Sequence, residues 1–357
     1  SALAQHPRNP DLLFVGNEMG VSVSIDGGEQ WVRLDNGLPT VPVDDIKIQS
    51  RENDLVIGTH GRGIWIMDDI TPLEELTPQA IVSEAHLYSI QDAISYNAYR
   101  PQGWTPGIFS ASNPAMGSRI RYHLAEDIKE VSLSITDLRG RLVRRLEGSG
   151  KKGLNEVVWD LRFQEENSKG DLMDLGPRVL PGVYLVQLEA GSSVLEGELT
   201  VRLDPRVTIT QAELITRQDA MISSYRLSGV VSEASSAIAR LETQLEDALG
   251  LLGKVSPESE GLANEIDQLL REIGKLETDL RENGGGANLA AQIGGFTGVP
   301  TADQLWQIDD SWEEVPPLIN RLNDLITDEV PALYAELDDA GIRPNPGSAI
   351  QMPQRRR

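Results

Sequence analysis

The sequence predicts a multidomain chain that is mainly β in its first part and α-helical in its last part. Short apolar runs with a period of two residues, separated by glycine-rich turns, fill residues 1–90 and again residues 118–204, which is typical of antiparallel strands. From residue 205 onward the apolar residues recur at helical spacing, so we expect helices that pack through one face. Prolines and glycines interrupt residues 91–117, which favours a linker between the two β regions.

Length, charge and cysteine content narrow the function classes. The chain has 357 residues, enough for about two or three domains with cores of their own, and its net charge is −23. Nucleic acids and anionic membranes attract basic surfaces, so this charge disfavours both as partners. No apolar run approaches the roughly 20 residues of a membrane-spanning helix. Because the chain has no cysteine, it has neither disulfides nor thiolate chemistry.

One stretch organises the first domain, LLFVGNEMGVSVSIDGGEQW, which begins at Leu12. Two strand-like runs are followed by Asp-Gly-Gly, a strong hairpin signal because glycine adopts positive φ without steric cost. Ser24, Asp26, Gly28 and Trp31 are spaced as Ser-x-Asp-x-Gly-x-x-Trp. We expect the Asp26 carboxylate to bind the amides of the turn and Trp31 to pack beneath it, which makes these residues a structural motif. A calcium ligand is the alternative role for Asp26.

A second unit of the same kind begins at Val43. The stretch NDLVIG has the same order of polar, apolar and glycine residues as PDLLFVG in the first unit. Gly63-Ile64 occupies the position that Gly20-Val21 has in the first unit, so the two units are offset by about 43 residues. That period is typical of the four-stranded blades of a β-propeller, and a closed propeller takes roughly 4–8 blades. We therefore expect residues 1–90 to be the last blades of a propeller. The start, SALAQHPRNP, has no methionine and no signal peptide, which favours a propeller remainder upstream in the same precursor, with an associated chain as the alternative.

These two units resemble known families. HPRNPDLLFVGNEMGVSVSIDGGEQW, followed by DLVIGTHGRGIWIMDDI, looks like the closing blades of large bacterial BNR-repeat proteins, and the Ser24–Trp31 spacing is similar to the Asp box of sialidase-like propellers. Such proteins resemble sortilin-type and photosystem-assembly-factor-type propellers and are often labelled glycosyl hydrolases. The resemblance implies an exported bacterial protein, periplasmic, cell-surface or extracellular. Residues 85–89 are a candidate further strand that seals the last blade.

Residues 118–204 contain about six or seven short strands with the spacing of an immunoglobulin-like sandwich. The stretches SITDLRGRLV, GLNEVVWD and LPGVY are similar to FlgD-like Ig domains, which often follow catalytic or adhesive domains on secreted bacterial proteins. A loop is inserted at 164–179. The aromatic residues of the preceding linker are expected to pin it in place, with an aromatic-lined glycan groove as the alternative; they are Tyr99, Trp104 and Phe109.

The last part of the chain predicts an antiparallel helical bundle over residues 205–345 and a disordered tail over residues 346–357. Capping boxes begin at Thr210 and Thr301, and three glycines ending at Gly286 close the second helix. We expect the leucine stripes of these helices to form a core. The remaining signals are an N-cap at Ser256 before Pro257 and a kink or restart at Pro316-Pro317.

No catalytic or cofactor motif is complete. The Gly-x-Gly-x-x-Gly pattern at Gly148 leads into a strand-like run, which excludes a dinucleotide site, and the four histidines have no metal-ligand spacing, so we expect no cofactor and no metal. The candidate ligand-binding residues are His60 and Arg62, exposed on the loop THGRG, where they could hold a carboxylate. The alternative is a tight turn whose Arg62 pairs with Asp68 or Asp69.

Two functions remain open on these observations. The first is a non-catalytic binding and scaffolding segment of an exported propeller protein, whose ligand is a glycan, a peptide or another envelope protein. The second is the C-terminal part of a glycan-acting hydrolase, glycosidase- or sialidase-like, whose catalytic residues lie in upstream blades. A glycosidase needs two carboxylates at a fixed separation, and two blades alone do not supply them.

Overall fold

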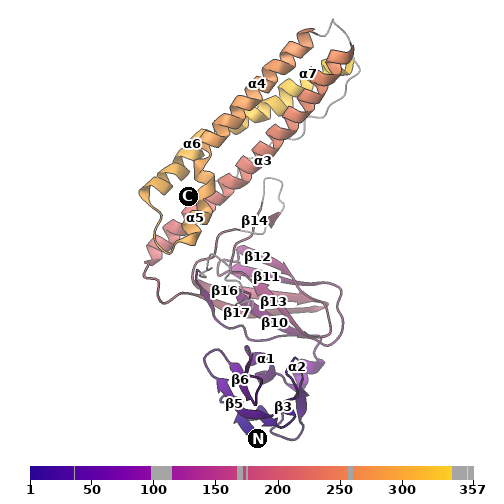
Figure 1. Ribbon diagram of the computed structural model, residues 1–357, viewed down its shortest axis with the longest axis vertical. Coiled ribbons are helices and arrows are strands. Elements are labelled where there is room, and N and C mark those ends of the chain that lie inside the picture. Colours follow the sequence, from indigo (N-terminus) through magenta and orange to yellow (C-terminus); the bar gives the residue numbers. More distant parts are fainter. Residues whose placement is uncertain are drawn as a thin grey trace. The chain divides into compact units, whose positions relative to one another are not determined.

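The computed structural model describes residues 1–35, 37–97, 115–166, 172–173, 176–255, 260–339 and 352. These residues form two compact units (Figure 1). The first contains β1–β8, β10–β13, β16 and most of β17, and the second contains the β14–β15 hairpin and every helix from α3 onward. The predicted order, mainly β and then α, is confirmed. The linker aromatics, the Ser256-Pro257 cap and most of the tail lie outside the described residues.

Two small antiparallel sheets open the first unit. The first sheet has the order β1-β2-β3-β4 and the second has the order β5-β6-β7. One core lies between them, and Phe14, Val21 and Val23 of the first sheet share it with Ile46 and Ile57 of the second. The strands are β1 (Ala2–Gln5), β2 (Leu13–Asn17), β3 (Gly20–Ser24), β4 (Val32–Leu34), β5 (Val43–Gln49), β6 (Asp54–Thr59) and β7 (Ile64–Met67).

The strand pairing within the first sheet recurs, residue by residue, within the second sheet. In the first sheet Val21 lies opposite Gly16 and Val23 opposite Phe14. In the second sheet Ile64 lies opposite Gly58 and Ile66 opposite Val56. The repeat predicted from the sequence is therefore present in the strand register.

Two short helices, α1 (Thr71–Glu74) and α2 (Pro78–Val82), follow β7. The strand after them, β8 (Ala85–Leu87), pairs with β10 and not with β7. The expectation that residues 85–89 seal the second sheet is therefore wrong. The helices carry the chain away from β7, so the backbone donors of β8 meet the edge of the next sheet.

The second β region of the first unit consists of two sheets. One has the order β13-β10-β8, and in the other β12, β11, β16 and β17 are neighbours. Strand β10 alternates buried and half-buried residues, and the buried Trp159 packs edge-on against Tyr184 at 5.5 Å between ring centres. The strands from β9 onward, of which β14 and β15 belong to the second unit, are β9 (Ala93–Ser95), β10 (Ser118–Leu124), β11 (Val131–Asp137), β12 (Leu142–Glu147), β13 (Gly153–Trp159), β14 (Glu165–Glu166), β15 (Leu172–Met173), β16 (Gly182–Ala190) and β17 (Ser193–Leu203).

The helical unit is built on long helices that share one leucine-rich core, with α3, α4 and α6 running side by side (Figure 1). The capping boxes at Thr210 and Thr301 are confirmed, since each threonine exchanges hydrogen bonds with the residue three positions later. The elements are α3 (Gln211–Val255), α4 (Glu260–Asn283), η2 (Gly285–Asn288), α5 (Leu289–Gly295), α6 (Ala302–Asp324), the π-helical turn η3 (Leu325–Glu329) and α7 (Val330–Asp339).

Two details of this unit differ from the sequence-based expectation. Helix α6 continues through Pro316-Pro317 without a restart, and the buried Val315 and Ile319 anchor it on both sides of the prolines. Met352, within the predicted disordered tail, is half-buried and packs against the leucine-rich core. Among the helices described, none is long and apolar enough to cross a membrane.

Candidate functional site

The turn after β3 has a buried serine at its centre. The Ser24 side chain is 1% exposed, and its hydroxyl donates to the Asp26 carboxylate at 2.7 Å and accepts the Gly28 amide at 2.9 Å. The Asp26 carboxylate also accepts the Gln30 amide at 2.9 Å. Trp31 lies against Gly28 and donates its indole N–H to the Gly28 carbonyl, but 42% of it stays exposed, so it does not pack beneath the turn as we expected. Ser24 fills the inner side of the turn instead.

The electrostatics of this turn agree with a structural role. The Gln30 amide, followed by the Ser24 hydroxyl, holds the pKa of Asp26 below its ordinary value. The Ser24 hydroxyl and the Asp26 Oδ1 atom are thus both engaged with protein groups. Within the described residues no group of three or more His, Cys, Asp or Glu side chains is placed to hold a metal ion. The described residues therefore offer no cluster of carboxylates for a calcium site at Asp26.

Ser24→Ala is expected to destabilise the first unit by about 1–2 kcal/mol, because it leaves the Gly28 amide without its acceptor and frees one Asp26 bond. Urea unfolding followed by circular dichroism measures the change. Ser22→Ala, on the same strand but only half-buried, is the matched control and should change the free energy of unfolding by less than about 0.5 kcal/mol. Equal effects of the two variants would contradict the role given to the Ser24 hydroxyl.

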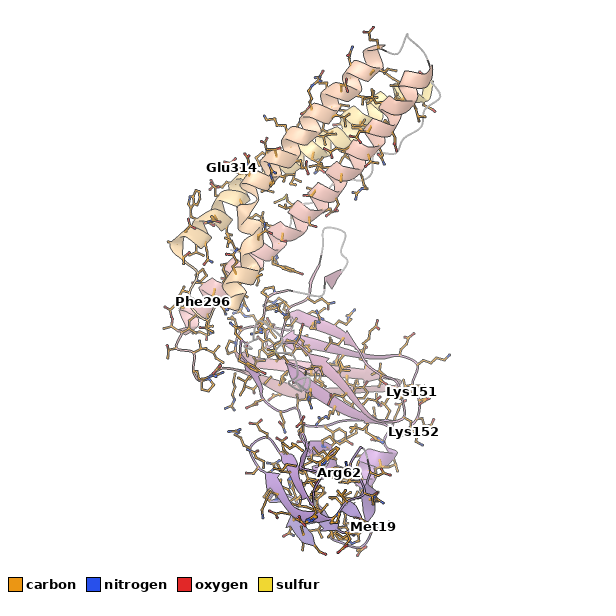
Figure 2. All side chains as sticks on the ribbon, in the orientation of Figure 1. Met19, Arg62, Lys151, Lys152, Phe296 and Glu314 are labelled. Carbon is orange, nitrogen blue, oxygen red and sulfur yellow. The ribbon has the colours of Figure 1, made fainter. Side chains whose placement is uncertain are left out.

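The THGRG loop connects β6 and β7 in the second sheet. The turn that contains Asp26 follows β3 in the first sheet, so the loop and this turn belong to opposite ends of the strands. His60 Nδ1 lies 3.2 Å from the Asp44 carboxylate, with 78% of the His60 side chain exposed. Arg62 is exposed (Figure 2), and its carbonyl accepts the indole N–H of Trp65. The loop thus places His60 beside Asp44 of β5, with Arg62 two residues further along the chain, and all three are exposed to solvent.

The acids that the sequence offered as partners of Arg62 pair with other arginines. Asp68 lies 3.4 Å from Arg119, and Asp69 lies 2.6 Å from Arg121. Among the described residues Arg62 itself has no ion pair within 4.0 Å. Its guanidinium is therefore available for an anionic group from outside, in the weak, solvent-exposed manner of a surface residue.

A buried polar network that the sequence did not reveal connects the two opening sheets. His6 and Asn53 are each 2% exposed, and His6 Nε2 lies 2.8 Å from the Asn53 side-chain oxygen. His6 Nδ1 accepts two backbone amides, so Nε2 carries the proton and donates it to Asn53. The Asn53 amide donates to Thr71 Oγ1 at 3.1 Å and to the Glu74 carboxylate at 3.0 Å.

Glu74 receives a second, charged partner in this network. Arg8 donates two hydrogen bonds to its carboxylate, at 2.9 and 2.8 Å. These bonds lower the pKa of Glu74 despite its partial burial. The arrangement joins the loop after β1, the loop before β6 and helix α1 in one set of contacts. Its buried atoms are satisfied by protein groups, which favours a structural role over catalysis.

The same network reaches the second β region through Asp69. This residue has a φ of 51°, its carboxylate accepts Gln91 at 2.6 Å and Arg121 at 2.6 Å, and its carbonyl accepts Arg121 as well. Arg121 on β10 also binds Glu156 on β13 at 2.8 Å. Sequence reasoning missed these residues because their partners are distant in the chain. The one local pattern that indicated structure in this region was the proline at the start of α1.

Comparisons with known proteins identify no family for this chain. No protein-family model matches it, and no curated protein does. Among solved structures the chain has a weak similarity to a biofilm-associated protein BSP domain, with 7% sequence identity and a TM-score of 0.19. That match covers 58% of this chain and 25% of the other, so the chain spans about a quarter of that structure's length.

Proposed function

We propose that this chain is a binding and scaffolding segment of an exported β-propeller protein and that its first two sheets are blades of a ring completed by further blades. In this proposal the immunoglobulin-like second β region is a spacer, and the antiparallel helical bundle is a docking element. The ligand of the assembled protein is a glycan, a peptide or another envelope protein.

The observation that carries the proposal is a contrast in burial between equivalent positions. Val21 and Val23 of the first sheet are 0% and 6% exposed, because the second sheet covers them. Ile64 and Ile66 hold the same register positions in the second sheet and are 72% and 59% exposed. Large aliphatic side chains at such positions are expected to pack against a further sheet of the same kind.

The opposite faces of the two sheets show the same contrast in burial. Ile46 lies opposite Ile57 in the second sheet, and both are buried, at 2% and 3% exposure, against the first sheet. In the first sheet Leu3 lies opposite Val15, yet Leu3 is 69% exposed. Each sheet thus offers one covered and one uncovered aliphatic face, which supports the proposal that the two sheets are consecutive blades of a ring.

The test uses the absence of cysteine in the chain. Ile64→Cys in this 357-residue chain should react rapidly with a maleimide, and in the complete gene product it should react at least about tenfold more slowly, because upstream blades cover it. Val194→Cys, at a 60% exposed strand position elsewhere, is the matched control and should react equally in both. Equal rates at Ile64→Cys in both proteins would contradict the proposal.

A separate experiment tests the alternative function, that of a glycan-acting hydrolase. The complete gene product would be screened against polysaccharides and sialosides, with released sugar as the measured product. Turnover that disappears when acids at the mouth of the propeller are replaced would overturn a non-catalytic role. A complete gene product only slightly longer than this chain would remove the basis for the missing blades.

A further inference from the structure

Two histidines lie side by side where the chain passes from the opening sheets to the second β region. His86 on β8 is directly opposite His123 on β10 in an antiparallel pair. Directly opposed residues point to the same face of a sheet, with Cβ atoms roughly 4.5–5.5 Å apart. Both side chains are half-buried, and α2 packs against both strands.

Each of these histidines has one buried ring nitrogen without a hydrogen-bond partner. The two atoms are His86 Nε2 and His123 Nδ1. The His123 ring also has a polar interaction with the Ala80 backbone on α2, which acts to raise its pKa. Because Nδ1 has no partner, this interaction uses Nε2, and the unshared electron pair is left on Nδ1. A backbone carbonyl that orients one imidazole nitrogen in this way is the usual second contact of a metal-binding histidine.

The surroundings of His123 favour the uncharged form of its ring. Burial, then His86, then Lys152 lower the pKa of His123 below its ordinary value. Arg121 on β10 is paired with Asp69 and with Glu156 on β13, and α2, with the sequence PQAIV, contributes no charged side chain. Neutral imidazoles are ligands for Zn²⁺, Ni²⁺ and Cu²⁺, whereas imidazolium is not.

We propose that His86 and His123 form a two-histidine binding site for a divalent transition-metal ion, with water completing the coordination. The described residues place no third His, Cys, Asp or Glu side chain there, so we expect the site to bind the ion with moderate affinity. Bound metal would connect β8 to β10 and so fix the segment that joins the two β regions. The proposal is independent of the proposed function above.

The experiment titrates Ni²⁺, and separately Zn²⁺, into the 357-residue chain at pH 7.5 and follows heat release and the thermal midpoint. The expected result is one ion per chain and a raised midpoint, since a ligand of the folded state stabilises it. His86→Gln and His123→Gln should each weaken binding at least tenfold, and Glu126→Gln, an exposed control position just after β10, should not change it. Binding should fade as the pH falls below about 6, because protons compete for the same nitrogens.

A measurement on the unaltered chain keeps the test independent of variant folding. Nuclear magnetic resonance of the four histidine rings with substoichiometric Cu²⁺ should broaden the signals of His86 and His123 and leave those of His6 and His60 sharp. Broadening of His60 alone, no broadening of any ring, or undiminished Ni²⁺ binding in both Gln variants would overturn the proposal.

Discussion

Asn53→Ala is expected to lower the free energy of unfolding of the first unit by about 3–5 kcal/mol, the size of effect seen when a buried hydrogen-bond network loses its centre. Asn53 has a φ of 59°, a conformation that asparagine tolerates and that costs alanine roughly 1 kcal/mol or more. Its removal also leaves the buried His6 N–H without an acceptor and takes one donor from Glu74. Urea unfolding followed by tryptophan fluorescence measures the loss.

A glycine at the same position separates the two causes. Asn53→Gly accepts the positive φ, so it should be less destabilising than Asn53→Ala by about 1 kcal/mol while still losing the hydrogen bonds. Arg51→Ala, whose ion pair with Glu52 is exposed, serves as a nearby control and should cost less than about 0.5 kcal/mol. If Asn53→Ala were as mild as this control, the network would not connect the two sheets energetically.

Gly286→Ala is expected to destabilise the helical unit by about 3–5 kcal/mol, because overpacking against a backbone has no flexible side chain to absorb it. A Cβ at Gly286 would lie 2.5 Å from the Gln307 carbonyl oxygen and 2.8 Å from the Ile308 Cα on α6. The surrounding hydrogen bonds hold the turn in place, since Ser224 donates to the Gly286 carbonyl and Ser311 accepts its amide. Thermal unfolding followed by far-ultraviolet circular dichroism measures the change.

The neighbouring glycine provides the control for this substitution. A Cβ at Gly285 would meet nothing nearer than the end of the Gln307 side chain, at 3.9 Å. Gly285→Ala should therefore change the free energy of unfolding by less than about 0.5 kcal/mol. Similar losses in both variants would mean that chain flexibility, and not the approach of η2 to α6, explains the need for glycine here.

The β-strand pattern was predictable because alternation is a local signal. The two strand-like runs that precede Asp26-Gly27-Gly28 form β2 and β3, and the second unit that begins at Val43 forms β5, β6 and β7. The two capping boxes were equally visible, since Thr210 and Thr301 each bond a residue three positions away. Helices α1 and α2 were missed because each is only about one turn long and leaves no periodic pattern.

In the candidate site too, contacts between residues close in the sequence were predictable and contacts between distant residues were not. Ser24, Asp26 and Gly28 lie within a few residues of one another, so their spacing predicted a closed turn. The exposure of Trp31 did not follow from that spacing, because it depends on what fills the inner side. The partners of Asp68 and Asp69 are arginines on β10, about 50 residues away, and no local pattern indicates them.

By itself the sequence determined where most strands and the long helices form, how the first two sheets repeat, and that the chain is strongly acidic, since each of these depends on neighbours along the chain or on composition. Only the tertiary structure decided that β8 joins β10, that His6 meets Asn53 across 47 residues, and that Ile64 and Ile66 remain uncovered. The physical reason is that pairing, buried hydrogen bonds and exposure are properties of groups brought together by folding. Their partners lie far apart in the chain, where no periodicity connects them.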